Sequence, residues 1–536
     1  MTRESSALRE LTLPSAFARW VRDTPERVAL VDGDQRISFR DLDERSDRLA
    51  TALVTRGIGQ GDVIACQLPN VWEYACLLLA ASKIGAVISP QHIISRASEI
   101  EYCLGFGGAK AFFYIPSYAT FDYRAMLGNV RDRIPSLRLV VTARGAATEG
   151  ETAFEALLAG SAIDLGKRRP KPEDLFVLSF TSGTSGKPKG VLHTHNGPLS
   201  NAALTGELLE VGPEEVILCA SSFSFAYGTY TIMLAFARGA TQVLLDSFAP
   251  GPFFDLVERE RVSFVFGVPA IALALVNHPR AASTDLTALS KFMISGATHP
   301  PALVYRMRDL FGCTPIILWG MTETYRGTVT RLDDPMETIA TTVGGCRPGW
   351  EMVALDDAGR ILPPGEPGEL CVRGPMLFKE YLKSPEVMAE SFTPDGWFKT
   401  GDQAAVDERG YVKITGRIKD LIRRGGVSIS PREIEDILYA HPKIRDCALV
   451  AMPDDRLGER PCLFAVLQPG ADLSLDELRQ FLDAKGIAKY KWPERLEFID
   501  ELPLNAARKV RKNLLRDRIA AKLAEESGAT GGRIWG

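Results

Sequence analysis

The chain has 536 residues, which is too long for one compact core, and typical domain sizes predict about three to four structural units. Hydrophobic residues make up 46% and charged residues 24%, as in globular proteins, and the net charge of −4 excludes the basic surface that nucleic-acid binding needs. Nine cysteines without metal-ligand spacing predict buried, reduced thiols in a cytoplasmic protein. We expect no signal peptide and no membrane span, because no long apolar run occurs.

Short apolar strands alternate with amphipathic helices over the first 400 residues. Residues 27–39 predict a hairpin with an Asp-Gly turn, and a helix follows that Ser38 opens and Gly57 closes. Alternation of this kind predicts parallel sheets flanked by helices. Residues 351–374 differ and predict antiparallel strands that form a β-barrel-like subdomain. Further strands are expected at 62–69, 109–114, 138–143, 176–180, 216–220, 242–246 and 262–269.

The order of predicted helices and strands changes after residue 418. Helices are expected at 433–442 and 474–486, and strands at 447–453, 462–469 and 495–500. The sequence therefore predicts an α/β protein with a large N-terminal domain, residues 1–418, and a small α+β C-terminal domain, residues 419–536.

The segment TSGTSGKPKG, residues 181–190, follows an apolar strand and predicts a loop that holds phosphate. Its glycines let backbone N–H groups approach an anion, while its hydroxyls and lysines add donors. The spacing differs from that of the common phosphate loop, because only two residues separate Gly183 from Gly186. Taken alone, the segment also fits a flexible surface turn. His193 and His195 nearby fit support of the loop better than a metal pair.

Four further signatures follow in order: WGMTE (319–323), KTGD (399–402), GRIKD (416–420) and PLNAARKVRK (503–512). Together with the first loop they resemble the adenylate-forming superfamily of acyl-CoA synthetases, nonribosomal-peptide adenylation domains and luciferases. The resemblance covers nearly the whole chain and implies two steps. A carboxylate attacks the α-phosphate of ATP to give an acyl-adenylate, and a thiol, usually that of coenzyme A, then displaces AMP.

The resemblance also implies roles for single residues. Trp319 would face the adenine, Thr322 the α-phosphate, Asp402 the ribose hydroxyls and Arg417 the ribose or phosphate. Glu323 would hold Mg²⁺, a cation that prefers oxygen ligands. The implied nucleotide site also includes Thr181, Ser182, Gly183, Thr184, Ser185, Gly186, Lys187, Gly320 and Met321, with Thr184 and Glu323 counted as catalytic.

Lys509 is the catalytic lysine that the resemblance implies, where it would bridge the carboxylate and the α-phosphate. The family pattern is Pro-x-Thr-x-x-Gly-Lys, and Lys509 stands at the matching distance from Pro503. Asn505 and Arg508 replace the family's Thr and Gly, which puts the shape of this loop in question.

Three segments, residues 221–230, 295–301 and 319–327, match those that enclose the acid in relatives of the family. Their residues give a mainly neutral lining, in which Arg326 is the one cation, so a dicarboxylate is disfavoured. We expect an alicyclic, aromatic or medium-chain acid, because the sequence is most similar to those of cyclohexanecarboxylate and medium-chain fatty acid CoA ligases. The predicted acyl pocket comprises Phe225, Ala226, Tyr227, Gly228, Gly296, Ala297, Thr298 and Met321.

In the C-terminal domain, Gly425 and Gly426 match the family loop along the coenzyme A channel, although an ordinary glycine turn also fits them. Lys419 matches the hinge about which this domain would turn between the two steps.

Three other functions remain open from the sequence. The adenylate could be passed to a carrier-protein phosphopantetheine, or the chain could be a non-catalytic homologue that binds nucleotide or acyl groups. A phosphate-loop NTPase is opposed by the glycine spacing.

Overall fold

The structure is a computed structural model that describes residues 11–164, 166, 169–181, 188–297, 299–346, 349–425, 427–505 and 509–530. Contacts divide the chain into two compact units. The first comprises Met1–Thr298, Ala302–Glu351 and Arg373–Phe392, and the second comprises His299–Pro301, Met352–Val372 and Thr393–Gly536. The sequence predicts a domain boundary at residue 418, about which the C-terminal part would turn. This boundary stays a prediction.

A nine-stranded sheet forms one layer of the first unit. Its central strands run parallel, and antiparallel strands close both edges. The order across the sheet is β18 (Gly345–Cys346), β17 (Thr328–Val329), β16 (Thr314–Trp319), β15 (Lys291–Ser295), β14 (Phe264–Gly267), β12 (Val216–Cys219), β13 (Thr241–Leu244), β1 (Val28–Asp32) and β2 (Gln35–Ser38).

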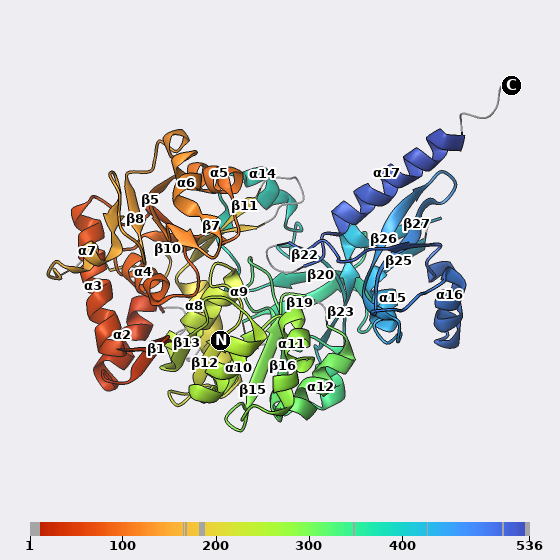
Figure 1. Ribbon diagram of the computed structural model, residues 1–536, viewed down its shortest axis with the longest axis horizontal. Helices are drawn as coiled ribbons and strands as arrows, with labels where there is room; N and C mark the ends of the chain where they lie inside the picture. Colours follow the sequence, from red (N-terminus) through yellow and green to blue (C-terminus); the bar gives the residue numbers. More distant parts are fainter. Residues whose placement is uncertain are drawn as a thin grey trace. The chain divides into compact units, whose positions relative to one another are not determined.

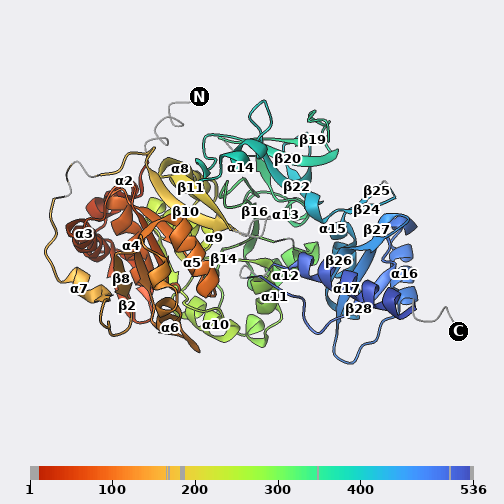
Figure 2. The ribbon, with the colours of Figure 1, turned by 90° about the horizontal axis from the view of Figure 1, so that it is seen from above.

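An eight-stranded sheet forms a second layer, and it is also mainly parallel. Figure 2 shows its antiparallel pair β10 and β11 side by side in yellow. The order is β21 (Glu380–Tyr381), β11 (Lys189–Thr194), β10 (Leu175–Thr181), β4 (Val87–Pro90), β3 (Val63–Gln67), β5 (Ala109–Tyr114), β8 (Leu139–Thr142) and β9 (Thr152–Ala153).

Helices cover these sheets and fill the space between them. All twelve residues of α4 (Trp72–Lys83) are buried; most are apolar, and its two charged residues form ion pairs, Glu73 with Arg144 and Lys83 with Asp43 and Asp47. The other longer helices are α2 (Leu13–Asp23), α3 (Phe39–Thr55), α5 (Ala97–Gly107), α8 (Asn196–Leu208), α9 (Ala226–Arg238), α10 (Pro250–Arg259), α11 (Pro269–Val276) and α12 (Pro301–Phe311). The shorter ones are α6 (Tyr123–Gly128), α7 (Phe154–Leu158), α13 (Met336–Thr341) and α14 (Pro385–Glu390).

The first hairpin and helix form as the sequence predicts. β1 and β2 pair antiparallel around the Asp-Gly turn. Ser38 caps α3, because its hydroxyl accepts from the Asp41 backbone N–H while the Asp41 carboxylate accepts from the Ser38 N–H. The predicted strands at 62–69, 109–114, 138–143, 176–180, 216–220, 242–246 and 262–269 each overlap a strand of the structure. The prediction of parallel sheets flanked by helices is thereby confirmed.

The second unit contains two sheets. A four-stranded sheet joins β19 (Glu351–Leu355), β20 (Pro367–Arg373), β22 (Phe398–Val406) and β23 (Val412–Arg417). A five-stranded sheet joins β25 (Val427–Ile429), β24 (Ile422–Arg424), β27 (Gly458–Leu467) and β26 (Ile444–Asp454), with β28 (Arg495–Phe498) beside β27. Its helices are α15 (Pro431–Leu438), α16 (Leu475–Ala484) and α17 (Lys512–Thr530).

The long helix α17, drawn in blue in Figure 1, completes the core of the five-stranded sheet. Leu515 and Ile519 are buried there among side chains of β26 and β27. Arg516 pairs with Asp420 at 3.0 Å, so this helix also holds the segment that follows β23.

Two expectations about the whole chain can be compared with the structure. All nine cysteines are free thiols, and only Cys346 among them is partly exposed. Among the described residues, no helix has the length and apolar character needed to cross a bilayer.

Candidate functional site

Parallel strands of the nine-stranded sheet bring three motif segments to one edge. The segment from Ser221 to Gly228 follows β12, Gly296 and Ala297 follow β15, and the WGMTE motif begins at the end of β16. β15 pairs with both β16 and β14, and β14 pairs with β12. The carboxyl ends of parallel strands share one edge, which is where open α/β sheets bind their ligands.

The loop after β16 folds back on itself without room for a side chain at Gly320. A Cβ there would lie 1.7 Å from the Tyr325 carbonyl oxygen. Thr324 and Tyr325 both donate their backbone N–H to the Met321 carbonyl, and Gly327 donates to that of Trp319. The backbone therefore fixes the directions in which residues 319–323 point.

Glu323 is held from a separate strand. Its side chain is buried, and Tyr381 of β21 donates its hydroxyl to Glu323 Oε1 at 2.8 Å. Phe378 donates its backbone N–H to the Glu323 carbonyl at 2.9 Å. The carboxylate is thus an oriented oxygen donor, which suits the hard cation that the sequence assigns to it.

His193 supports the WGMTE loop, although in the sequence it stands beside the predicted phosphate loop. It lies on β11 and donates from Nε2 to the Thr322 carbonyl oxygen at 2.7 Å. His195 instead stacks on Phe176, with ring centroids 4.3 Å apart. Burial lowers the pKa of His193 to about 4 and that of His195 to about 3, so both are neutral at pH 7. The described residues contain no cluster able to hold a metal through histidine, cysteine and carboxylates.

The base of the predicted phosphate loop is an antiparallel ladder. Thr181 at the end of β10 pairs with Lys189 at the start of β11. The Tyr102 hydroxyl donates to the Pro188 carbonyl at 3.2 Å. Ser182, Gly183, Thr184, Ser185, Gly186 and Lys187 lie outside the described residues, so their predicted roles stay predictions.

The predicted acyl-pocket residues sit where α9 begins and where β15 and β16 end. Phe225, Ala226 and Tyr227 are partly exposed, as is Met321. Gly228 is buried in the first turn of α9, Gly296 is partly exposed and Ala297 is exposed. Thr298 lies outside the described residues. The predicted acyl-pocket residues that the structure describes thus lie at one edge of the nine-stranded sheet. Their contact with an acid remains a prediction.

The one cation of these segments is engaged inside the protein. Arg326 is fully buried and donates from Nε to Asn201 Oδ1 at 3.2 Å. Its charge and hydrogen bond also act on Tyr230, whose pKa rises to about 12 because burial outweighs them. Asn201 and Tyr230 come from α8 and α9, so the guanidinium belongs to a buried polar network.

The second unit brings three predicted nucleotide-site residues together. Asp402 and Arg417 are register partners on β22 and β23, and Arg417 Nε lies 2.8 Å from Asp402 Oδ1. Asp402 is buried, whereas the Arg417 side chain is 46% exposed. Lys509 is close enough to both to feel their charges.

Lys509 has an unusual acid–base environment. Burial, together with the positive charges of Arg417 and Lys419, lowers its pKa to about 8 against the attraction of Asp402. The ammonium form still dominates at pH 7, but deprotonation begins far earlier than for an ordinary lysine.

Asn505 closes the Lys509 loop, although the family has Thr at this position. The Lys509 backbone N–H donates to Asn505 Oδ1 at 2.9 Å, and the Asn505 N–H donates to the Lys509 carbonyl at 2.8 Å. An isolated antiparallel bridge between Leu504 and Val510 frames the loop. The substitution therefore keeps a closed loop, while Arg508 lies outside the described residues.

Gly425 is the turn residue between β24 and β25, with φ of +55°. It donates its N–H to the Leu457 carbonyl at 2.8 Å. Gly426 lies outside the described residues, and Lys419 lies in the short 3₁₀ turn Ile418–Asp420. The coenzyme A channel and the hinge are untested by these contacts and stay predictions.

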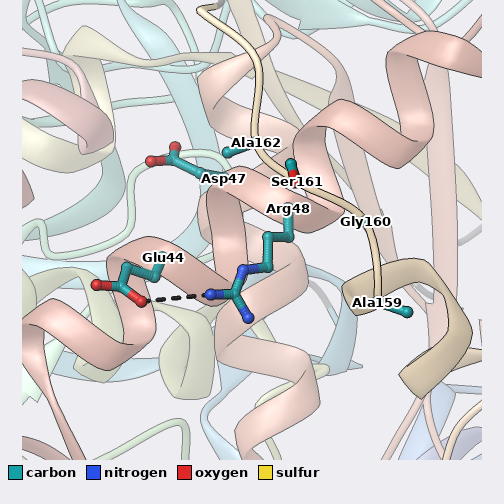
Figure 3. Close-up of a pocket in the computed structure, with 7 residues that line it drawn as sticks. All are labelled: Glu44, Asp47, Arg48, Ala159, Gly160, Ser161 and Ala162. Carbon is teal, nitrogen blue, oxygen red and sulfur yellow. Dashed lines mark hydrogen bonds and ion pairs between the residues drawn. The ribbon is translucent and has the colours of Figure 1, made fainter.

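A shallow polar depression on α3 involves none of the motif residues. Figure 3 shows Arg48 paired with Glu44 at 3.5 Å within it. Its lining consists of Glu44, Asp47, Arg48, Ala159, Gly160, Ser161 and Ala162.

Comparison with known proteins confirms the family that the motifs predict. The model of the AMP-binding enzyme family matches residues 17–382, and that of the AMP-binding enzyme C-terminal domain matches residues 433–509. The chain belongs to the AMP-binding enzyme family. It is an ATP-dependent, adenylate-forming acid ligase.

Similar proteins carry names with different acids. The chain is 34% identical to a medium-chain fatty-acid–CoA ligase of Escherichia coli, over 98% of this chain and 93% of the relative. It is 35% identical to a 2,3-dihydroxybenzoate-AMP ligase of Bacillus subtilis, over 93% and 92% of the two chains. ATP-bound MatB from Rhodopseudomonas palustris has a TM-score of 0.86 and 28% identity, and covers 95% of this chain and 99% of its own.

The sequence did not predict several residues that support the site. Tyr381 bonds Glu323 of the WGMTE motif, 58 positions away, and Asn201 bonds Arg326, 125 positions away, and no local pattern marks either of them. His92 is another such residue, since it contacts the predicted pocket residue Phe225. Its position just after the parallel strand β4 was the available signal.

Proposed function

We propose that the protein joins an apolar monocarboxylic acid to coenzyme A through an acyl-adenylate. In the first step the acid's carboxylate oxygen attacks the α-phosphorus of ATP, a new P–O bond forms, and pyrophosphate leaves. In the second step the thiolate of coenzyme A attacks the acyl carbon and AMP leaves, so the thiol proton passes to solvent.

Lys509 would act in the first step, where two anions must approach each other. An ammonium group between them offsets their repulsion in the transition state. Its neighbours Asp402 and Arg417 would hold the ribose and phosphate of the same nucleotide. The pairing of Asp402 with Arg417 and the lowered pKa of Lys509 support a site in which charged side chains bind the nucleotide and offset the repulsion between the two anions.

Glu323 would hold Mg²⁺ together with phosphate oxygens of ATP. When bound, the cation would neutralise part of the charge on the phosphates. Glu323 fits this role because its carboxylate is buried and oriented by Tyr381.

The observation that carries the acid class is the engagement of Arg326. A second carboxylate on the acid would need a cation, and the one cation of the pocket segments is bound within the protein to Asn201. The partly exposed side chains of Phe225, Ala226 and Met321 offer apolar contacts instead. An aliphatic, alicyclic or aromatic monocarboxylic acid fits this lining.

A panel of acids tests the proposal by pyrophosphate release. Medium-chain, alicyclic, benzoic and hydroxybenzoic acids are each mixed with protein and ATP, and dicarboxylates of equal length serve as matched controls. We expect release with apolar monoacids and none above background with dicarboxylates. Release with dicarboxylates alone would contradict the acid class.

Loading of a carrier protein is the second candidate, because one relative bears the name of an aryl acid–AMP ligase. Parallel reactions with coenzyme A and with a phosphopantetheinylated carrier protein separate the two acceptors. We expect the coenzyme A thioester to form faster. Exclusive labelling of the carrier would favour the second candidate, and no adenylate with any acid would indicate a non-catalytic homologue.

A further inference from the structure

The start of α9 is tied to the neighbouring sheet by a buried asparagine. Asn70 follows β3 and donates from Nδ2 to the Ser221 carbonyl at 2.9 Å, while its Oδ1 accepts from the Phe223 N–H at 2.7 Å. Both contacts are to backbone atoms of the segment that leads into Phe225. The two sheets of the first unit therefore fix the backbone of this segment together.

His92 extends this connection to the side chain of Phe225. The two rings lie with centroids 4.1 Å apart and planes tilted by 33°. Ser224 Oγ lies 3.1 Å from His92 Nδ1, and Ser222 Oγ lies 2.8 Å from Ser224 Oγ. A chain of two hydroxyls thus fixes the orientation of the imidazole that backs the Phe225 ring.

The loop that carries His92 is itself held in place. Gln67 of β3 donates from Nε2 to the His92 carbonyl at 2.9 Å and to the Ser95 carbonyl at 3.1 Å. Burial lowers the pKa of His92 to about 4, so its ring is neutral at pH 7 and presents no charge beside Phe225. A part of each of His92 and Phe225 nevertheless remains accessible, and the pair lies at the edge of the sheet where the acid is expected.

We propose that His92 is a positioning residue for acid specificity, acting through Phe225. The stacked ring limits the rotamers of Phe225, so the pair, and not Phe225 alone, sets the depth and width of the acyl site. This inference rests on the proposed function, in that it takes Phe225 to line that site. It predicts that the acid profile depends on a histidine that belongs to the other sheet.

Three variants of His92 separate its ring from its hydrogen bond. His92→Ala removes both, His92→Asn keeps a group able to bond Ser224, and His92→Phe keeps the stacked ring. Phe225→Ala should enlarge the acyl site and shift preference toward bulkier acids. We expect His92→Ala and His92→Asn to raise the kcat/KM ratio of a bulky to a slender acid by about tenfold, in the same direction. We expect His92→Phe to stay within about threefold of the parent ratio.

The double variant His92→Ala with Phe225→Ala tests the coupling. If His92 acts through Phe225, the double variant should show the ratio of Phe225→Ala alone, because coupled residues are not additive. His278→Ala is the matched control, since His278 stacks on Phe254 with centroids 5.7 Å apart and is no part of the proposed site. It should leave the ratio unchanged, and the KM for ATP should stay constant in all variants.

Binding of non-reactive acyl-sulfamoyl adenosines of graded acyl size, measured by calorimetry, gives the same ratios without turnover. A parent-like acid ranking in His92→Ala beside a shifted ranking in Phe225→Ala would overturn the inference. An unchanged ranking in Phe225→Ala would overturn it as well, although adenylate formation would continue. Failure of the proposed function is a separate result, since it requires that the parent release no pyrophosphate with any acid.

Discussion

The loop after β16 and the loop before α17 both carry residues expected to act on ATP, but they are held by different means. Gly320 and its neighbours are fixed by backbone hydrogen bonds and by an approach too close for any side chain. Lys509 lies in a short loop closed by Asn505, and its properties depend on the charges of Asp402 and Arg417. The first loop should therefore be sensitive to shape and the second to charge.

Gly320→Ala should have the largest effect, because its Cβ would lie 1.7 Å from the Tyr325 oxygen. The loop must rearrange, so we expect both half-reactions to be lost and the free energy of unfolding to fall by about 3 kcal/mol or more. Gly251→Ala in α10 is the matched control, since a Cβ there meets no atom within 4 Å. Equal activity of the two variants would show that the loop adapts.

Lys509→Ala should remove one half-reaction and spare the other. We expect adenylate formation to fall by about 10²–10³-fold, while thioester formation from supplied acyl-AMP stays near the parent rate. Single-turnover assays of each half-reaction make the comparison, with Lys522→Ala, which loses the exposed pair with Glu497, as control. Equal loss in both half-reactions would contradict the role assigned to Lys509.

The pH dependence of adenylation should follow the ammonium form of Lys509. Its pKa is lowered to about 8, so the charged form is lost as pH rises through that value. We expect the adenylation rate to be flat below pH 7 and to fall about tenfold per pH unit above pH 8. Lys509→Arg keeps its charge and should flatten this fall; an unchanged fall would assign it to another group.

The smallest effect concerns stability. The folded-state pKa of His195 is lowered from 6.5 to about 3, so the unfolded chain binds a proton first as pH falls below 6.5. Its contribution to stability is full above that pH and should shrink by about 1.4 kcal/mol between pH 7.5 and 5.5. His195→Phe keeps the ring on Phe176 and should remove this contribution to the pH slope in urea titrations. An identical slope in the two proteins would show that His195 takes up its proton equally in the folded and unfolded states, so that its folded-state pKa is not lowered.

Periodicity and turn chemistry were sufficient to predict the elements that position the site. Ser38 caps its helix as expected, and each predicted strand overlaps an observed one. These features are local, because caps, hairpin turns and apolar strands are encoded within a few residues.

The supports of the site were not predictable in this way. Tyr381 orients Glu323, Asn201 engages Arg326 and His92 backs Phe225, and each pair is joined only by the tertiary fold. The replacement of the family's Thr by Asn505 left the shape of the Lys509 loop open from the sequence. In the structure, the amide oxygen and the backbone of Asn505 both bond Lys509, and the effect of the replacement on adenylation stays a prediction.

The free cysteines have a practical consequence for assays. Eight of the nine thiols are buried, and burial raises the pKa of Cys76, Cys103 and Cys313 to about 12, so the reactive thiolate is scarce at neutral pH. A chromogenic disulfide reagent added to the folded enzyme should therefore report chiefly the coenzyme's own sulfhydryl as it is consumed. Without coenzyme, the same reagent would report unfolding, because the eight buried thiols react only as the interior opens and Cys346 alone is partly exposed in the folded chain.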